Sequence, residues 1–227
     1  MDRITKLEKL VATFFANHRI PDEHGVVHSR NVVAWAEKAI SHMTIPPNVK
    51  LCILAAAMLH DVDDRKYFKG NEYANAPALL SAVDWPHEEY SLIIEMIDIV
   101  SCSRNGNSTA SPLWKLIPRD ADRLEAIGEV GVQRCMAYTE ETKRPIMIAG
   151  VTPLPVTDAE LDTVACESRF REYCRTGRSA SFIDHFYDKL LHIGTMGSGS
   201  ALLQSEADRR MRYMRNYLLE KNKTLIA

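Results

Sequence analysis

Apolar side chains recur every three or four residues along most of this chain, which is the spacing of one face of an α-helix. The pattern is clear at residues 4–14 and again at residues 32–43, and strand-like alternation of apolar and polar positions is scarce. An all-helical protein is therefore expected. The same spacing predicts further helices over about residues 48–60, 74–82, 87–101, 118–138, 158–175, 179–192 and 200–221.

Two stretches interrupt the helical pattern. Residues 101–112 (SCSRNGNSTASP) have the composition of a loop, and residues 143–158 (KRPIMIAGVTPLPVTD) contain three prolines and one glycine. The second stretch is long for a connection inside a compact domain, and such length is typical of a lid or a binding loop. The chain has 227 residues, 46% of them hydrophobic, so we expect one domain spanning residues 1–227.

Charge and cysteine content narrow the class of protein. The formal net charge is -2, from 28 basic and 30 acidic residues, so no nucleic-acid or anionic-membrane partner is expected. The five cysteines form no CxxC pair and are odd in number, which favours reduced thiols in the cytoplasm over a secreted disulfide framework. No apolar run approaches the roughly 18 residues that span a bilayer. We expect a soluble cytoplasmic protein, and the sequence does not indicate its oligomeric state.

Three polar residues lie where the pattern predicts burial. His60 and Asp61 end the uncharged run of residues 51–59, and His28 lies four residues before Val32 on the same helix face. A backbone carbonyl could satisfy His28, and a hydrogen bond between His60 and Asp61 could satisfy that pair. A divalent ion would account for all three together, because imidazole nitrogens and carboxylate oxygens suit first-row metals.

A fourth ligand could come from residues 117–128 (IPRDADRLEAIG), which offer Asp120 and Asp122 near a helix start. Both could instead be ordinary carboxylates that interact with the helix dipole. Helical periodicity favours Asp120 as the ligand, because it shares a face with Leu124 and Ile127 and Asp122 points away from that face.

The phrases HDVDDRKYFKG, DADRLEAIGEVGVQR and HFYDKLL, together with the preceding HGVVH, resemble the HD-domain metal-dependent phosphohydrolase superfamily. They are most similar to a subgroup of small single-domain proteins that includes nucleoside triphosphate pyrophosphohydrolases. The resemblance implies a helical bundle of about eight or nine helices, with a metal-site core over residues 20–140 and C-terminal helices over residues 158–221 packed on it. It also implies four metal ligands: His28, His60, Asp61 and Asp122. The subgroup usually has Asp-Trp where this sequence has Gly25 and Val26.

The resemblance further implies hydrolysis of a nucleotide with a divalent cofactor, manganese first and iron, cobalt, nickel, zinc or magnesium as alternatives. The expected reaction converts a nucleoside or deoxynucleoside triphosphate to a monophosphate and pyrophosphate. Two alternatives stay open at this point. One is a different phosphoester, such as a nucleoside monophosphate, an alarmone or a cyclic nucleotide. The other is a non-catalytic sensor that binds metal and nucleotide.

Residues around the four ligands supply candidates for catalysis and substrate binding. Asp64, three residues after the His-Asp pair, could orient or deprotonate the attacking water, and Lys66 could contact a phosphate oxygen and assist catalysis. His24 could line the mouth of the site. His185 and Lys189, four residues apart in HFYDKLL, could hold the distal phosphates. Salt bridges and solvated side chains are the ordinary alternatives for these residues.

Overall fold

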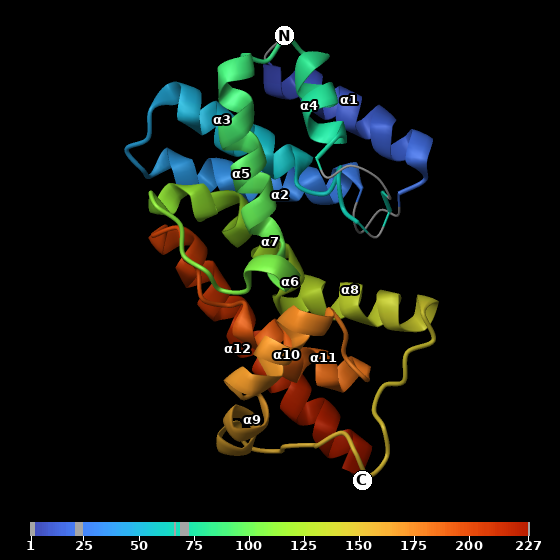
Figure 1. Ribbon diagram of the computed structural model, residues 1–227. Coiled ribbons are helices and arrows are strands. Elements are labelled where there is room, and N and C mark those ends of the chain that lie inside the picture. Colours follow the sequence, from blue (N-terminus) through green and yellow to red (C-terminus); the bar gives the residue numbers. More distant parts are fainter. Residues whose placement is uncertain (1–2, 21–24, 66, 69–72, 227) are drawn as a thin grey trace. The chain divides into compact units, whose positions relative to one another are not determined.

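The computed structural model of the protein describes residues 3–20, 25–65, 67–68 and 73–226. Within these ranges every regular element is a helix, so the all-helical fold predicted from the sequence is confirmed (Figure 1). The chain divides into two compact units, each of which is described by itself below. That the whole chain forms one domain remains a prediction.

Unit 1 comprises residues 1–101, 109–122 and 197–202. Its central element is α3 (Pro47–Leu59), which packs against α1, α2 and α5 (Figure 1). Every side chain from Cys52 to Leu59 is buried, as the uninterrupted apolar run predicts. The other elements of unit 1 are α1 (Arg3–His18), α2 (Val26–Ser41), α4 (Asn75–Ser81), η2 (His87–Glu89), α5 (Tyr90–Val100), η3 (Leu113–Leu116) and α7 (Ile117–Ala126) as far as Asp122.

Unit 2 comprises residues 102–108, 123–196 and 203–227. In it α10 packs against α6 and α11, and α8 packs against α11. Three aromatic residues of α11, namely Phe182, Phe186 and Tyr187, are fully buried and form the centre of its core. Its elements are α6 (Cys102–Asn105), the end of α7, α8 (Gly128–Glu141), α9 (Asp158–Val164), α10 (Glu167–Thr176), α11 (Phe182–Asp188), η4 (Leu190–His192) and α12 (Ala201–Ile226) from Leu203 onward.

The prediction of one continuous helix over residues 118–138 is wrong. The chain breaks between α7 and α8. Ile127 has an extended backbone, and Gly128 has a φ of 77°, in the left-handed region that glycine tolerates best. The carbonyl oxygen of Ala126 also approaches Gly131 so closely that a Cβ there would lie 2.2 Å from it. Two glycines therefore allow a turn that apolar spacing does not reveal.

The other long predicted helices are also divided. Ala165 and Cys166 separate α9 from α10, and Lys189 separates α11 from η4. The stretch 101–112, expected to be a loop, also contains the short helix α6 (Cys102–Asn105). Together with these breaks, α6 explains why the described residues contain more helices than the eight or nine expected.

Residues 143–158 are irregular, as their composition predicts, and they are attached to the rest of unit 2 by hydrogen bonds along their length. Their contacts reach both the start of α11 and the end of α12. The bonds run from Phe182 N to Pro145 O (2.9 Å), Ile183 N to Ile146 O (3.0 Å), Tyr187 Oη to Pro153 O (2.9 Å) and Asn222 Nδ2 to Pro155 O (2.8 Å).

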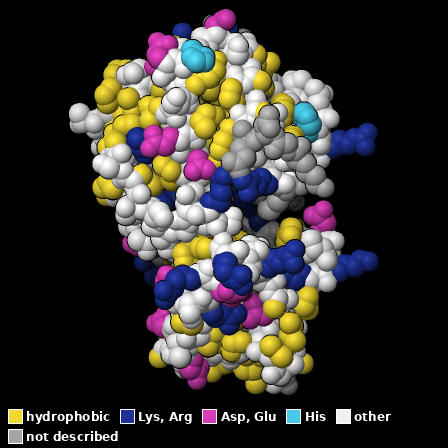
Figure 2. Space-filling view, viewed as in Figure 1, with side chains coloured by type: hydrophobic (Ala, Val, Ile, Leu, Met, Phe, Trp, Pro, Cys, Tyr) yellow, Lys and Arg dark blue, Asp and Glu magenta, His cyan; other side chains and the backbone are white. Residues whose placement is uncertain are grey.

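The surface of unit 2 mixes basic and acidic side chains. In the space-filling view, dark blue and magenta side chains lie beside one another over the segments drawn in orange in Figure 1 (Figure 2). Arg209 and Arg210 both pair with Glu206, so part of the basic charge of α12 is neutralised locally. None of the helices in the described residues has the length and hydropathy needed to cross a membrane.

Candidate metal centre

Two buried histidines of unit 1 face each other from adjacent helices. His28 is the third residue of α2 and is 5% exposed, and His60 directly follows α3 and is 8% exposed. The Nδ1 atom of His60 lies 2.9 Å from the carbonyl oxygen of Ala57, to which it donates a hydrogen bond. Because that bond places the proton on Nδ1, the Nε2 atom of a neutral His60 has its lone pair available as a ligand.

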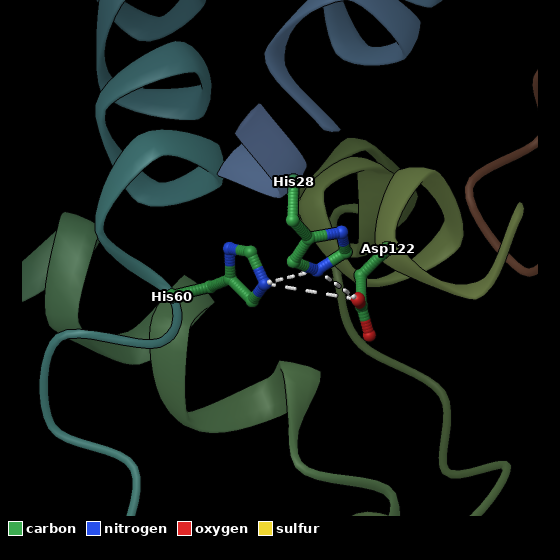
Figure 3. Close-up of side chains that lie close together, drawn as sticks. All are labelled: His28, His60 and Asp122. Carbon is green, nitrogen blue, oxygen red and sulfur yellow. Dashed lines mark hydrogen bonds and ion pairs between the residues drawn. The ribbon is translucent and has the colours of Figure 1, made fainter. Parts of the chain in front are cut away.

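The side chain of Asp122 completes a group of three with these histidines (Figure 3). His28 Nε2 lies 3.2 Å from His60 Nε2 and 3.2 Å from Asp122 Oδ1, and His60 Nε2 lies 3.7 Å from Asp122 Oδ1. One nitrogen or oxygen atom from each residue therefore lies within 4.8 Å of the other two. The three atoms come from α2, the end of α3 and α7.

Asp61 lies beside the same two imidazoles. Its Oδ2 atom is 3.4 Å from His60 Nε2 and 3.8 Å from His28 Nε2, and its side chain is 14% exposed. The structure thus brings together all four residues that the family resemblance implies as ligands, and all four belong to unit 1.

The charges of the cluster shift its proton affinities strongly. Burial by itself would lower the pKa of His60, but the carboxylates of Asp61 and Asp122 outweigh it and raise that pKa to about 9. Burial would likewise raise the pKa of Asp122, but His28 and His60 hold it well below its ordinary range. A positive charge between the side chains is therefore strongly favoured.

The atoms of the cluster fit a divalent ion. Two imidazole nitrogens 3.2 Å apart repel each other unless a proton or a cation lies between them. Two imidazoles and two carboxylates form a mixed nitrogen and oxygen donor set, which suits manganese, iron, cobalt, nickel or zinc. The hydrogen bond from His60 to Ala57 is the kind of supporting contact that orients a metal-bound histidine.

Asp120, the ligand favoured by helical periodicity, has other partners. Its side chain is fully buried, so the periodicity was correct about burial. Its Oδ2 atom accepts a hydrogen bond from the backbone N–H of Ser198 at 2.7 Å, and its Oδ1 atom lies 3.4 Å from Arg119 Nη2. Asp122, by contrast, is 27% exposed and reaches His28. Burial of a side chain on this helix therefore does not imply that it lies beside the histidines.

Asp64, the candidate base, follows the His-Asp pair by a single turn. The helix α3 has already ended at Leu59, but the N–H of Asp64 donates to the carbonyl oxygen of Asp61 at 3.2 Å. Its side chain is partly exposed. Lys66 and His24 lie outside the described residues, so their predicted roles rest on the sequence.

His185 and Lys189 both belong to unit 2 and contact the ring of Tyr173 there. His185 Nδ1 lies 3.2 Å from Ser179 Oγ, and Lys189 Nζ lies 5.7 Å from the centre of the Tyr173 ring. The helix α11 ends at Asp188, one residue before Lys189. Their predicted contacts with phosphate remain predictions.

Sequence reasoning missed the carbonyl of Ala57 as the partner that orients His60. The available signal was that Ala57 lies three residues before His60 at the end of a helix, where carbonyl groups lack partners within the helix.

Sequence reasoning also missed two contacts of the segment after Asp64. The ring of Phe68 contacts Phe14, with 5.3 Å between ring centres, and the hydroxyl of Tyr73 donates to Asp98. No pattern in the sequence indicated those partners.

Comparisons with known proteins add a family and a fold. No family model matches the chain. An uncharacterized protein, L803 of Acanthamoeba polyphaga mimivirus, is 37% identical over 228 residues, which cover 93% of each chain. The chain belongs to the family of this viral protein.

Solved structures with the same fold include a Lactobacillus plantarum protein with a TM-score of 0.73 and 23% identity, covering 99% of this chain and 97% of its own. An HD-superfamily hydrolase of Bacillus thuringiensis has a TM-score of 0.67 and 22% identity, covering 99% and 97%. The chain therefore shares the fold of this HD-superfamily hydrolase. Bacillus subtilis YpgQ in complex with ADP has the same fold, with a TM-score of 0.66 and 18% identity, covering 98% of this chain and 94% of its own.

Proposed function

We propose that this HD-fold protein is a divalent-metal-dependent phosphohydrolase that acts on nucleotides. The observation that carries the proposal is the convergence of His28, His60 and Asp122, with Asp61 beside them, in a chain with the HD fold. A cluster of two histidines and two carboxylates is costly to bury unless its charges are balanced, and a divalent ion balances them.

In this proposal His28, His60, Asp61 and Asp122 hold the ion, with manganese as the first candidate. A divalent ion bound there would lower the pKa of a coordinated water and offset charge on phosphoryl oxygens. The chain itself contributes the orientation of the ligands. The bond from His60 Nδ1 to Ala57 holds the imidazole in one direction, so His60 need not rotate when the ion binds.

Other residues have proposed roles in catalysis and substrate binding. Asp64 accepts a proton from the attacking water or orients it, because the turn from Asp61 places it shortly after the ligand pair. Lys66 is proposed to contact a phosphate oxygen, and His24, His185 and Lys189 to contact the substrate. These assignments rest on the family resemblance of the sequence.

A nucleotide substrate is supported by two observations. The sequence phrases resemble a subgroup that includes nucleoside triphosphate pyrophosphohydrolases, and YpgQ, which shares the fold, binds ADP. The proposed reaction adds water to a nucleoside triphosphate and releases a monophosphate and pyrophosphate. A cytoplasmic location and the lack of a nucleic-acid partner stay predictions of composition.

The deciding experiment is a nucleotide panel assayed with metal-stripped protein, with and without added Mn²⁺. We expect ³¹P NMR to show pyrophosphate released from a nucleoside triphosphate only when Mn²⁺ is present. Release of orthophosphate from a monophosphate or another ester would assign a different substrate to the same metal centre. Nucleotide binding without turnover across the panel would overturn the enzyme and favour a sensor.

Paired variants test the proposed ligands. Asp122→Asn should abolish Mn²⁺ binding, whereas Asp120→Asn should destabilise the fold and leave Mn²⁺ affinity unchanged, because Asp120 is engaged by Ser198 and Arg119. His60→Ala should also abolish binding, with the exposed His42→Ala as its control. Full metal content in Asp122→Asn, measured by inductively coupled plasma mass spectrometry, would refute the assignment.

The proposed base is tested separately. Asp64→Asn should retain Mn²⁺ and lower kcat about 100-fold or more, the size typical of a lost general base. Unchanged turnover would return Asp64 to a structural role.

A further inference from the structure

Three hydrogen bonds join the turn after α3, which carries Asp61, to the start of α4. The carboxylate of Asp63 accepts the backbone N–H of Asn75 on Oδ1 and that of Ala76 on Oδ2, each at 2.9 Å. In return, the side-chain amide of Asn75 donates to the carbonyl oxygen of Val62 at 2.8 Å. We call these three hydrogen bonds the Asp63–Asn75 clamp.

The clamp satisfies groups that local sequence leaves without partners. The residue before α4 is Ala74, whose methyl group cannot accept the first N–H groups of the helix. Asp63 supplies the missing acceptors from twelve residues earlier in the chain, and its negative charge interacts favourably with the helix dipole. At the other end, the amide of Asn75 satisfies the carbonyl of Val62 beyond the end of α3.

The helix α4 is a firm support for these bonds. Its Ala76 and Leu80 side chains are fully buried, and the helix packs against both α1 and α5 of unit 1. The turn after α3 has little regular structure of its own. It contains backbone bonds from Val62 N to Leu59 O at 3.1 Å and from Asp64 N to Asp61 O at 3.2 Å.

The clamp lies directly beside two of the proposed metal ligands in the chain. His60 and Asp61 immediately precede Val62 and Asp63, and their placement beside His28 depends on the path of this turn. Ligand geometry is demanding, because displacement of a few tenths of an ångström from the productive arrangement weakens metal binding. We propose that Asp63 and Asn75 are positioning residues for the metal ligands His60 and Asp61.

This inference rests on the proposed metal binding, and Mn²⁺ affinity is its first test. Asp63→Ala removes both acceptors and should raise the Mn²⁺ dissociation constant about 10-fold or more, as loss of contacts behind metal ligands does. Asn75→Ala leaves the backbone bonds to Asp63 intact and should produce a smaller rise. Asp63→Asn retains one acceptor oxygen and should preserve most of the affinity. Isothermal titration calorimetry well below the unfolding temperature provides the constants.

Thr157→Ala is the matched control, because Thr157 also caps a seven-residue helix by accepting the N–H of Glu160, at 3.3 Å, but belongs to unit 2. It should lower stability and leave Mn²⁺ affinity unchanged. Wild-type affinity in Asp63→Ala would overturn the positioning role. If Asp63→Ala does not fold, Asn75→Ala carries the test, and a wild-type Mn²⁺ dissociation constant in that variant would overturn the positioning role.

Hydrogen exchange of the metal-free protein separates this inference from the proposed function. Loss of the clamp should speed exchange at the amides of Val62 and Asp64, whereas Thr157→Ala should not. If the wild-type protein bound no Mn²⁺, the proposed function would fail, and faster exchange in Asp63→Ala would still support the clamp as the device that orders the turn. Unchanged exchange at both amides would overturn the clamp whatever the metal results.

Discussion

The two units each contain a buried polar cluster, and the clusters differ in the chemical groups that meet in them. In unit 2, the Asp184 carboxylate accepts hydrogen bonds from Ser181 Oγ at 2.6 Å, Thr152 Oγ1 at 2.8 Å and Arg169 Nη2 at 2.7 Å. Arg169 also donates to Asp188 at 2.6 Å. These four donor atoms each meet a carboxylate oxygen, and the guanidinium offsets one of the two carboxylate charges.

The cluster in unit 1 has a different composition. Two imidazole nitrogens, His28 Nε2 and His60 Nε2, lie 3.2 Å apart, and the carboxylates of Asp61 and Asp122 lie beside them. Imidazole nitrogens that face each other require a shared proton or a cation. Burial of polar groups alone therefore does not mark a functional site. The distinguishing feature is a pair of facing imidazole nitrogens beside two carboxylates, a donor set that suits a divalent cation.

The largest expected difference appears when one member of each cluster is removed. Asp184→Ala leaves Arg169 with a single carboxylate and should lower the free energy of unfolding by about 3 kcal/mol, the cost of breaking a buried pair. Its Mn²⁺ affinity should stay at the wild-type value. Urea unfolding measures the stability, and calorimetric titration measures the Mn²⁺ affinity. A loss of Mn²⁺ affinity in this variant would show that the unit 2 cluster also contributes to metal binding.

Added metal should stabilise the protein through unit 1. A ligand at 100 times its dissociation constant stabilises the folded state by about 2.7 kcal/mol if it does not bind the unfolded chain. We expect Mn²⁺ to produce that increase in wild type and in Asp184→Ala, and none in His60→Ala. Urea unfolding with and without Mn²⁺ provides the increments. An undiminished increment in His60→Ala would show that the ion binds elsewhere.

The two clusters should also respond in opposite ways to pH in the metal-free protein. The pKa of His60 is raised to about 9, so its contribution to stability is complete below its ordinary pKa of 6.5 and disappears as pH rises through 9. Burial would raise the pKa of Asp184, but its bonds to Ser181, Arg169 and Thr152 lower it overall. The contribution of Asp184 is therefore complete above its ordinary pKa and disappears in acid.

Urea unfolding from pH 4 to 10 tests these signs. His60→Ala should flatten the alkaline limb of the stability curve, and Asp184→Ala should flatten the acidic limb. Because protons compete with the ion for His60, Mn²⁺ affinity should rise between pH 7 and 9, by at most about tenfold per pH unit. Mn²⁺ affinity that fell over this range would contradict the assignment of His60 as a ligand.

The sequence predicted much of the fold because helical spacing records which side chains face the core. It placed α3 correctly as a buried helix and identified residues 143–158 as irregular. It did not show the break at Ile127 and Gly128, because that break depends on a positive φ and on the approach of a carbonyl to Gly131. These are properties of backbone conformation that apolar spacing does not contain.

For the candidate site, the sequence by itself determined which residue types were available and, through family resemblance, which four were expected to converge. Only the tertiary structure decided their surroundings. Asp120 and Asp122 are two residues apart on one helix, yet one meets Arg119 and Ser198 and the other meets His28. Asp63 likewise finds its partners on α4, beyond the range of any local pattern. Periodicity specifies the direction of a side chain from its helix, but its chemical partner depends on which segments fold against that face.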